Sequence, residues 1–520
     1  MLLSDFFIII ICMSNKQAKD SFNYMMDKTE ARDSYAHVLK YTGIFGGVQG
    51  LSILVGLVRN KLVALLLGPG GMGLVSLFNS AISFISQATN LGISFSAVRH
   101  ISEIFDSGDE ARVSHYIKVV RAWSLVTALF GMFVCVVAGP FLSDYTFSWG
   151  DHTIHFLLLS PVVGMLAITG GETAILKGAR RLKALALIQI YSVFAALVIS
   201  VPVYYSWGQK GIVPVIVITA FASMLLTVSY SYRYYPLRIN GSNGVLGEGM
   251  EMVRLGVAFV LSGIMGSGAE VVIRSFLNVS ADLDTVGLYN AGYMITVTYA
   301  GMVFTAMETD YFPRLSAVNH DVQAVNLAAN RQIEVSLLII SPMLAFLIIS
   351  LPVLIPLLYS HSFVPVVSMA QVAVFSMYLK SMSLPVAYIT LAKGDSLAFF
   401  ALEAVYDVLL VILIVFGFRM WGLFGTGVAL SLSYLLDLVM ILVYAYVRYR
   451  YVVSPQVRKY VFIQFPLGIA AYSVTLISHS WLYWLSGVGV VALSTAVSVY
   501  ILHKKTSLWN KLKQKMWRHG

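Results

Sequence analysis

Four basic side chains fall inside long apolar stretches of this sequence: Arg59, Lys61, Arg274 and Lys380. An ionisable group at membrane depth is costly, so it usually faces a cavity, a partner or a substrate path. Arginine presents a planar, two-pronged set of N–H donors that matches a phosphate or a carboxylate. The chemistry that these residues offer is therefore the binding of an anion inside a membrane.

Arg59 and Arg274 stand at matching depths in the first and the seventh apolar stretch, so we expect them on facing walls of one cleft. Lys61 lies two residues beyond Arg59 and points to nearly the opposite helix face, where it either faces the cleft or reaches the outer surface. Glu270 precedes Arg274 by one helical turn, so the alternative for Arg274 is an ion pair with Glu270.

Tyrosines and carboxylates complete the predicted site. Tyrosine rings pack against sugar faces, and deep carboxylates can balance a cation or carry a coupling proton. Glu172, by contrast, reads as an interfacial charge near the inner surface. The predicted substrate-binding residues are Arg59, Asn60, Arg274, Lys380, Tyr289 and Tyr293. The predicted coupling residues are Glu403, Asp407 and Asp437.

The elements that must hold these residues are transmembrane helices. The chain is 58% hydrophobic and 12% charged, whereas soluble domains have about 25% charged residues. Apolar blocks of about 20 residues, each long enough to cross a bilayer, recur along it, and backbone groups in lipid need the internal hydrogen bonds of a helix. We expect an all-α polytopic protein with about fourteen helices. The expected crossings are 41–67, 72–97, 119–142, 153–176, 184–206, 211–232, 255–278, 286–312, 333–355, 367–392, 398–418, 421–447, 461–479 and 481–502.

The two halves of the chain resemble each other. Arg59-Asn60-Lys61 followed by Gly73-Leu74-Val75 is matched by Arg274-Ser275-Phe276 followed by Gly287-Leu288-Tyr289. This pattern predicts two pseudo-symmetric six-helix bundles with the substrate path between them. The predicted segments are a tail (1–40), a bundle (41–232), a linker (233–254), a bundle (255–447), two further helices (448–502) and a basic tail (503–520).

Lysine and arginine predict the orientation. With the N-terminus inside, one cytoplasmic loop holds Lys177, Arg180 and Lys183, and the tail after Leu502 is strongly basic. The outer loops then hold only Lys210 and Arg419. We therefore expect both termini in the cytoplasm. The net charge of +10 follows from these inner loops beside an anionic leaflet and implies no nucleic-acid partner.

Other motifs have structural explanations. The segment 68–73 matches Gly-x-Gly-x-x-Gly but joins two apolar stretches, so we expect a tight turn and not a dinucleotide site. Asp282-Leu283-Asp284 is expected to be a solvated outer loop. The chain has two cysteines and none of the known nucleophile or metal motifs. We therefore expect no catalytic site, metal or cofactor. Met1–Cys12 is too short to span and lacks signal-peptide features, so we expect Met13 to be the native start.

The stretch 56–68, Gly-Leu-Val-Arg-Asn-Lys-Leu-Val-Ala-Leu-Leu-Leu-Gly, resembles the first-helix signature of polysaccharide and lipid-linked oligosaccharide flippases (the Wzx-type O-antigen flippases). These belong to the multidrug/oligosaccharidyl-lipid/polysaccharide exporter superfamily. Phe312-Pro313-Arg314-Leu315 and Ala392-Lys393-Gly394-Asp395 are similar to that group too. The resemblance covers roughly residues 40–500, including the count of fourteen helices.

The resemblance implies a V-shaped pair of bundles that works by alternating access in the bacterial inner membrane. The implied substrate is an undecaprenyl-diphosphate-linked oligosaccharide, turned from the inner to the outer leaflet. The implied partners are membrane lipids, a polysaccharide polymerase and chain-length proteins. Arg59 matches a cavity arginine of the related lipid II flippases, which usually carry Asp where this chain has Asn60. The alternatives are a cation-coupled multidrug exporter of the same fold and a lipid II flippase.

Overall fold

The computed structural model describes residues 28–106, 109–146, 151–236 and 245–506, and every regular element in them is a helix. The expectations about Met1, Met13 and the basic tail after Thr506 lie outside these residues. The elements are α2 (Lys28–Thr89), α3 (Ile93–Asp106), α4 (Glu110–Thr146), α5 (Thr153–Gly178), α6 (Leu182–Trp207), η1 (Gly208–Gly211), α7 (Ile212–Tyr234), α8 (Val245–Ser280), α9 (Leu283–Tyr293), the π-helix η2 (Met294–Tyr299), α10 (Ala300–Ala317), α11 (Val322–Leu358), η3 (His361–Val366), α12 (Val367–Ala373), α13 (Phe375–Ala392), α14 (Ser396–Tyr449), α15 (Pro455–Val474) and α16 (Ser480–Thr506).

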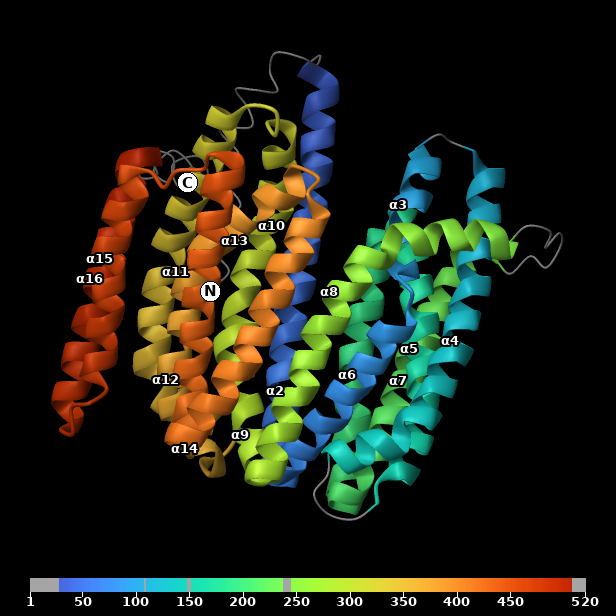
Figure 1. Ribbon diagram of the computed structural model, residues 1–520, viewed down its shortest axis with the longest axis horizontal. Coiled ribbons are helices and arrows are strands. Elements are labelled where there is room, and N and C mark those ends of the chain that lie inside the picture. The colour runs from blue at the N-terminus through green and yellow to red at the C-terminus, as the bar shows by residue number, and fades with distance from the viewer. Residues whose placement is uncertain (1–27, 107–108, 147–150, 237–244, 507–520) are drawn as a thin grey trace, which may run out of the picture.

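The helices form two bundles that diverge toward the upper end of the view in Figure 1. Helices α3 to α7 make the right-hand bundle, and α9 to α14 make the left-hand one. Helices α15 and α16 pack on α11 at the outer flank of the left-hand bundle. Helices α2 and α8 run between the bundles and contact both. This confirms the predicted all-α architecture of two bundles with an added C-terminal helix pair.

Eight stretches of the described chain are long and apolar enough to cross a membrane, and one bent pair would make a ninth. Three of the eight have 40, 53 and 54 residues: Gly50–Thr89, Leu182–Tyr234 and Ser396–Tyr449. One crossing needs about 20 residues, so each of the three is long enough for two. The total of fourteen crossings stays a prediction.

Each of these long stretches is divided by a glycine with positive φ: Gly68 at 66°, Gly208 at 55° and Gly422 at 58°. An added Cβ at any of the three would meet no atom within 4 Å, so backbone conformation and not crowding selects glycine there. The expected tight turn at 68–73 is confirmed, since the chain bends at Gly68.

One expected helix end is wrong. The helix expected to cross at 72–97 ends at Thr89, because Leu91 and Gly92 adopt φ of 52° and 72° and turn the chain into α3. Helix α8 begins at Val245, within the expected linker 233–254, and that linker stays a prediction. Gly249 of α8 faces the indole of Trp123 on α4, where a side chain would not fit, so this glycine allows the two helices to pack.

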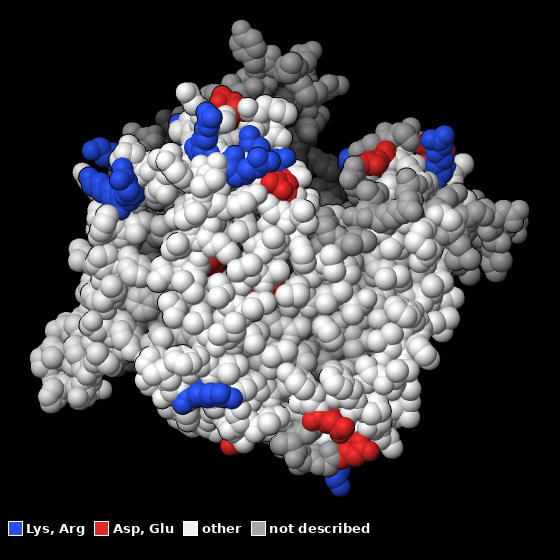
Figure 2. Space-filling model, in the orientation of Figure 1, with Lys and Arg blue, Asp and Glu red and all other residues white. Residues whose placement is uncertain are grey.

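The outer surface is that of a membrane protein. Phe133, Phe416 and Phe462 expose 65%, 63% and 79% of their surfaces. In Figure 2 the Lys and Arg residues gather at the upper end, and the broad middle of the molecule is almost free of charge. Contiguous exposed apolar surface on this scale fits lipid as the surrounding solvent.

Candidate substrate and coupling site

Three consecutive side chains of α2 contact three other helices. Arg59 Nε donates to Ser200 Oγ of α6 at 3.2 Å. Asn60 Nδ2 donates to Tyr299 Oη of the π-helix η2 at 2.8 Å, and Lys61 Nζ donates to the Pro356 carbonyl of α11 at 2.7 Å. Because successive helical residues point in different directions, this short segment ties the right-hand bundle to the left-hand one. Lys61 therefore faces a protein carbonyl and not open solvent.

Arg274 is buried among polar groups of α2, α8 and α9. Its Nε donates to Ser76 Oγ at 2.8 Å, and its second guanidinium nitrogen donates to Asn290 Oδ1 at 3.4 Å. The remaining nitrogen forms an ion pair with Glu270 at 3.2 Å, the alternative partner that the sequence offered. Arg274 and Arg59 share no hydrogen-bonding partner among the described residues. In this conformation Arg274 joins helices at the contact between the bundles.

The two predicted tyrosines lie on α9 with ring centroids 6.0 Å apart. Tyr289 is only 2% exposed and belongs to the main hydrophobic core, whereas Tyr293 is half-buried against that core. Tyr289 therefore offers no surface to a sugar in this conformation. Of the two, Tyr293 is the one that retains accessible surface.

The left-hand bundle contains a group of ionisable side chains on α13 and α14. Lys380 of α13 lies within electrostatic range of Glu403 and Asp437 of α14 and sits 6.0 Å from the centroid of the Tyr434 ring. Ser383 of α13 also interacts with Asp437. The structure thus brings together Lys380, Glu403 and Asp437, which the sequence placed in two separate roles.

Asp407 extends this group toward α8. It is buried, interacts electrostatically with Glu403 and Glu270, and faces Gly266 of α8, whose Cβ position lies 3.7 Å from a carboxylate oxygen. Across the group, Lys380 and Arg274 supply two positive charges against the four carboxylates of Glu270, Glu403, Asp407 and Asp437. An excess of carboxylates in a low-dielectric interior favours uptake of protons or another cation.

Sequence reasoning missed three uncharged members of the site. Ser76, Ser200 and Asn290 accept hydrogen bonds from the predicted arginines, but isolated Ser and Asn residues are common in membrane helices and carry no distinguishing signal. Asp282, expected in a solvated loop, caps α9 by accepting from the Thr285 N–H at 2.8 Å. Among the described residues, no three His, Cys, Asp or Glu side chains come close enough to share a metal ion.

Comparison with known proteins identifies the family. Residues 62–368, more than half of the chain, match the family described as "Polysaccharide biosynthesis protein". The chain belongs to this family. Two curated proteins of similar sequence are the lipid III flippases of Escherichia coli K12 and Shigella flexneri, each 23% identical over 277 residues. Those matches span 51% of this chain and 64% of each relative, so less than two thirds of the relative is covered.

Solved structures share the fold. The lipid II flippase MurJ in an inward closed conformation superposes with a TM-score of 0.69 over 89% of this chain and 99% of MurJ, at 12% identity. An inward-facing multidrug transporter of the MATE family, from the MOP superfamily, gives a TM-score of 0.67 over 78% of this chain and 96% of its own, at 16% identity. The chain is therefore a multi-span membrane protein of this family, and its fold is shared with the solved lipid II flippase MurJ and the MATE transporter.

Proposed function

We propose that this protein is a flippase for undecaprenyl-diphosphate-linked oligosaccharide repeat units. It moves them from the inner to the outer leaflet of the bacterial cytoplasmic membrane for surface-polysaccharide assembly, with both termini in the cytoplasm. The observation that carries the proposal is the segment Arg59-Asn60-Lys61, which places two cations on a helix shared by both bundles. A guanidinium and an ammonium at that point can bind a diphosphate and sense which way the bundles are tilted.

Alternating access follows from how these contacts are distributed. Arg59 bonds to one bundle, while Asn60 and Lys61 bond to the other. A diphosphate that competes for Arg59 and Lys61 would release Ser200 and the Pro356 carbonyl, so substrate binding and bundle movement become one equilibrium. Arg274 would exchange Glu270, Ser76 and Asn290 for the substrate only when the contact between α2, α8 and α9 opens.

After it releases the substrate, the empty protein must return to its inward-open state. We propose that the carboxylates of the left-hand bundle control this step. Asp407, Asp437 and Glu403 would take up a proton when the path opens to the outside and lose it inside. The partners proposed for the protein are its lipid-linked substrate, the membrane lipids and the polymerase and chain-length proteins that use the exported unit.

A cation-coupled multidrug exporter is the second candidate. One observation favours it, namely the carboxylates of Glu403, Asp407 and Asp437 near Tyr434, whose ring centroid lies 5.3 Å from that of Tyr406. Acidic and aromatic side chains together bind organic cations. Against it stand the two cations of the α2 segment, which would repel such a substrate. A lipid II flippase is disfavoured by Asn60, which replaces the expected Asp.

The test uses purified protein in proteoliposomes that hold a fluorescent undecaprenyl-diphosphate oligosaccharide in one leaflet. We expect the protein to make the label accessible to a membrane-impermeant quencher on the opposite side. Ethidium transport in the same vesicles is the comparison. If ethidium is transported and the oligosaccharide stays in its leaflet, the exporter is the correct function. Equal activity with lipid II would broaden the substrate class beyond the one proposed and overturn the exclusion of lipid II.

A further inference from the structure

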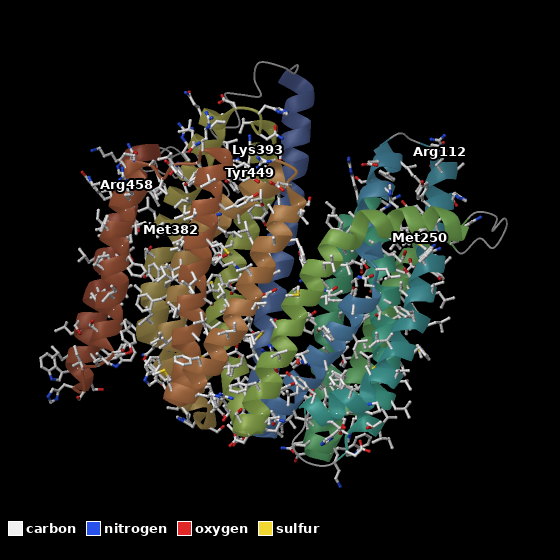
Figure 3. All side chains as sticks on the ribbon, in the orientation of Figure 1. Arg112, Met250, Met382, Lys393, Tyr449 and Arg458 are labelled. Carbon is white, nitrogen blue, oxygen red and sulfur yellow. The ribbon has the colours of Figure 1, made fainter. Side chains whose placement is uncertain are left out.

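A cavity of about 570 Å³ opens at the upper end of the left-hand bundle, where α13 ends, α11 begins and both ends of α14 meet. Three cations line it, Lys393, Arg448 and Arg450, together with the carboxylate of Asp395. Figure 3 shows Lys393 and Tyr449 close together there, and Figure 2 shows the cations that gather at this end. None of the lining residues belongs to α2 or α8, so the cavity lies apart from the site between the bundles.

The carboxylate of Asp395 already accepts hydrogen bonds from other groups of the protein. Asp395 accepts from the Tyr449 hydroxyl at 2.9 Å, from the Tyr444 hydroxyl at 3.1 Å and from the Ala398 N–H at 3.4 Å. The hydrogen bond from Tyr449 is the main cause that holds the pKa of Asp395 below its ordinary value. With Asp395 directed at these donors, three cations against one carboxylate leave the cavity with two positive charges in excess.

The cations have spare donors. In the described part of the chain, the guanidiniums of Arg448 and Arg450 form no hydrogen bond or ion pair, although Arg448 is near enough to act electrostatically on Asp395. Lys393 Nζ donates to the Asn319 carbonyl, which leaves two of its three N–H groups available. Unpaired guanidiniums around a cavity form a receptor for a phosphate group.

Arg450 has a backbone conformation that is unfavourable for an arginine. It adopts φ 55° and ψ 35° at the end of α14, a left-handed position that glycine or asparagine fills with less strain. Main-chain bonds hold this conformation without help from the side chain. The Arg450 N–H donates to the Tyr446 carbonyl at 3.1 Å, and its own carbonyl accepts from Asn326 Nδ2 at 3.2 Å. The backbone gains nothing from the guanidinium, so the side chain needs another reason to be there.

Two exposed apolar residues lie close in sequence to residues that line the cavity, and they indicate the kind of ligand. Leu397 follows Asp395 by two residues and is 77% exposed, and Val447 precedes Arg448 and is 76% exposed. A soluble anion would use only the cations, whereas a lipid would place its phosphate on the cations and its acyl chains on these apolar side chains.

We propose that this cavity binds the headgroup of an anionic phospholipid from the leaflet at the cation-rich end. Its phosphate contacts Arg448, Arg450 and Lys393, and the excess of two positive charges suits a lipid with two phosphates. The bound lipid ties the start of α14 to its end and so stiffens the left-hand bundle at the side where the bundles diverge.

The experiment measures lipid binding to the purified full-length protein by native mass spectrometry, with cardiolipin, phosphatidylglycerol and phosphatidylcholine as separate ligands. The test variant is the double substitution Arg448→Gln and Arg450→Gly. The matched control is Arg458→Gln with Lys459→Gln, which removes the same charge from exposed positions on α15, away from the cavity (Figure 3). Arg450→Gly alone is the third variant, since glycine keeps the left-handed backbone.

We expect cardiolipin to bind more tightly than phosphatidylcholine, and the double variant to weaken cardiolipin binding about tenfold or more, while the control changes it less than about twofold. Arg450→Gly should weaken binding without lowering the melting temperature. The proposal is overturned if both double variants lose affinity equally, or if phosphatidylcholine binds as well as cardiolipin. It is also overturned if inorganic phosphate binds in the same variant-sensitive way and displaces the lipid, because the site would then serve a free anion. Lipid binding is measured without transport, so the result is independent of the function proposed above.

Discussion

Gly73 of α2 and Gly287 of α9 pack backbone to backbone. A Cβ on Gly73 would lie 3.0 Å from the Gly287 nitrogen and 2.1 Å from the Leu283 carbonyl oxygen, and a Cβ on Gly287 would lie 3.1 Å from the Gly73 nitrogen and 1.9 Å from the Pro69 carbonyl oxygen. These two glycines are the equivalent landmarks of the two sequence repeats. Such a meeting of equivalent residues is compatible with a two-fold axis that passes between them, and it makes this crossing a tight junction of α2 with the left-hand bundle.

Gly73→Ala and Gly287→Ala should therefore force α2 and α9 apart. We expect each to lower stability by about 1–3 kcal/mol, the usual cost of overpacking, seen as a lower melting temperature in detergent. Gly56→Ala on α2 is the control, because a Cβ there meets no atom within 4 Å and alanine favours a helix. Similar melting temperatures for all three variants would contradict the tight junction.

Arg121 and Glu172 form an ion pair at 2.8 Å with side-chain exposures of 10% and 4%. Ser231 also donates to Glu172 at 2.5 Å, and the guanidinium lies 4.1 Å from the centroid of the Tyr232 ring. Removing one member of a buried pair leaves an uncompensated charge, so we expect Arg121→Ala to cost about 3–5 kcal/mol.

Arg112 provides the comparison on the same helix, at the tip labelled in Figure 3. Its ion pair with Asp109 is 3.3 Å long, but the arginine is 75% exposed, so Arg112→Ala should cost about 0–1 kcal/mol. The loss of melting temperature in Arg121→Ala is compared with the loss in Arg112→Ala. Equal losses would mean that burial does not strengthen the dependence on Arg121.

Asp395 gives a pH dependence whose sign is fixed by its lowered pKa, caused mainly by the hydrogen bond from Tyr449. A carboxyl that is more acidic in the folded state adds stability above its unfolded pKa of about 3.9, and this stability is lost as the pH falls through the folded pKa. Asp395→Asn should thus lower the melting temperature most near pH 7, and the difference from wild type should shrink below about pH 4. A difference that stays constant across this range would show that the charge of Asp395 is not used.

Arg59 is predicted to bind the substrate anion. At matched expression, Arg59→Ala should abolish polymer export, Arg59→Lys should keep part of it, and Lys61→Ala should be milder. Ser200→Ala is the control that removes only the hydrogen-bond acceptor of Arg59. If Ser200→Ala fails as completely as Arg59→Ala, the arginine acts through α6 and not through the substrate.

The membrane potential should assist export. A diphosphate carries about two negative charges, and its outward movement from a negative cytoplasm is favoured by about 2.3 kcal/mol per charge per 100 mV. In proteoliposomes, a potential negative on the donor side should accelerate translocation with no pH gradient. A rate that follows only the pH gradient would mean that the substrate charge is compensated and that protonation of Asp407 or Asp437 supplies the drive.

The helices were predictable because apolar length is a direct physical requirement of the bilayer. The turn at Leu91 and Gly92 was not, since it interrupts a run, 72–97, that has no proline and whose other glycine, Gly73, is helical. The partners of the charges were the least accessible information. Glu172 read as an interfacial charge because its partner, Arg121, lies 51 residues earlier, and no local pattern links positions that far apart.

The contacts of α2 also determine when this helix can complete its packing during synthesis of the protein. The partner of Asn60 lies 239 residues further along the chain and that of Lys61 lies 295 residues further. At translation rates of roughly 5–20 residues per second, the two side chains wait between roughly 12 and 60 s for Tyr299 and Pro356 to be made. Until then Lys61 must keep its charge among water or lipid headgroups at the membrane surface. The first described helix thus reaches its final position only after much of the second bundle has entered the membrane.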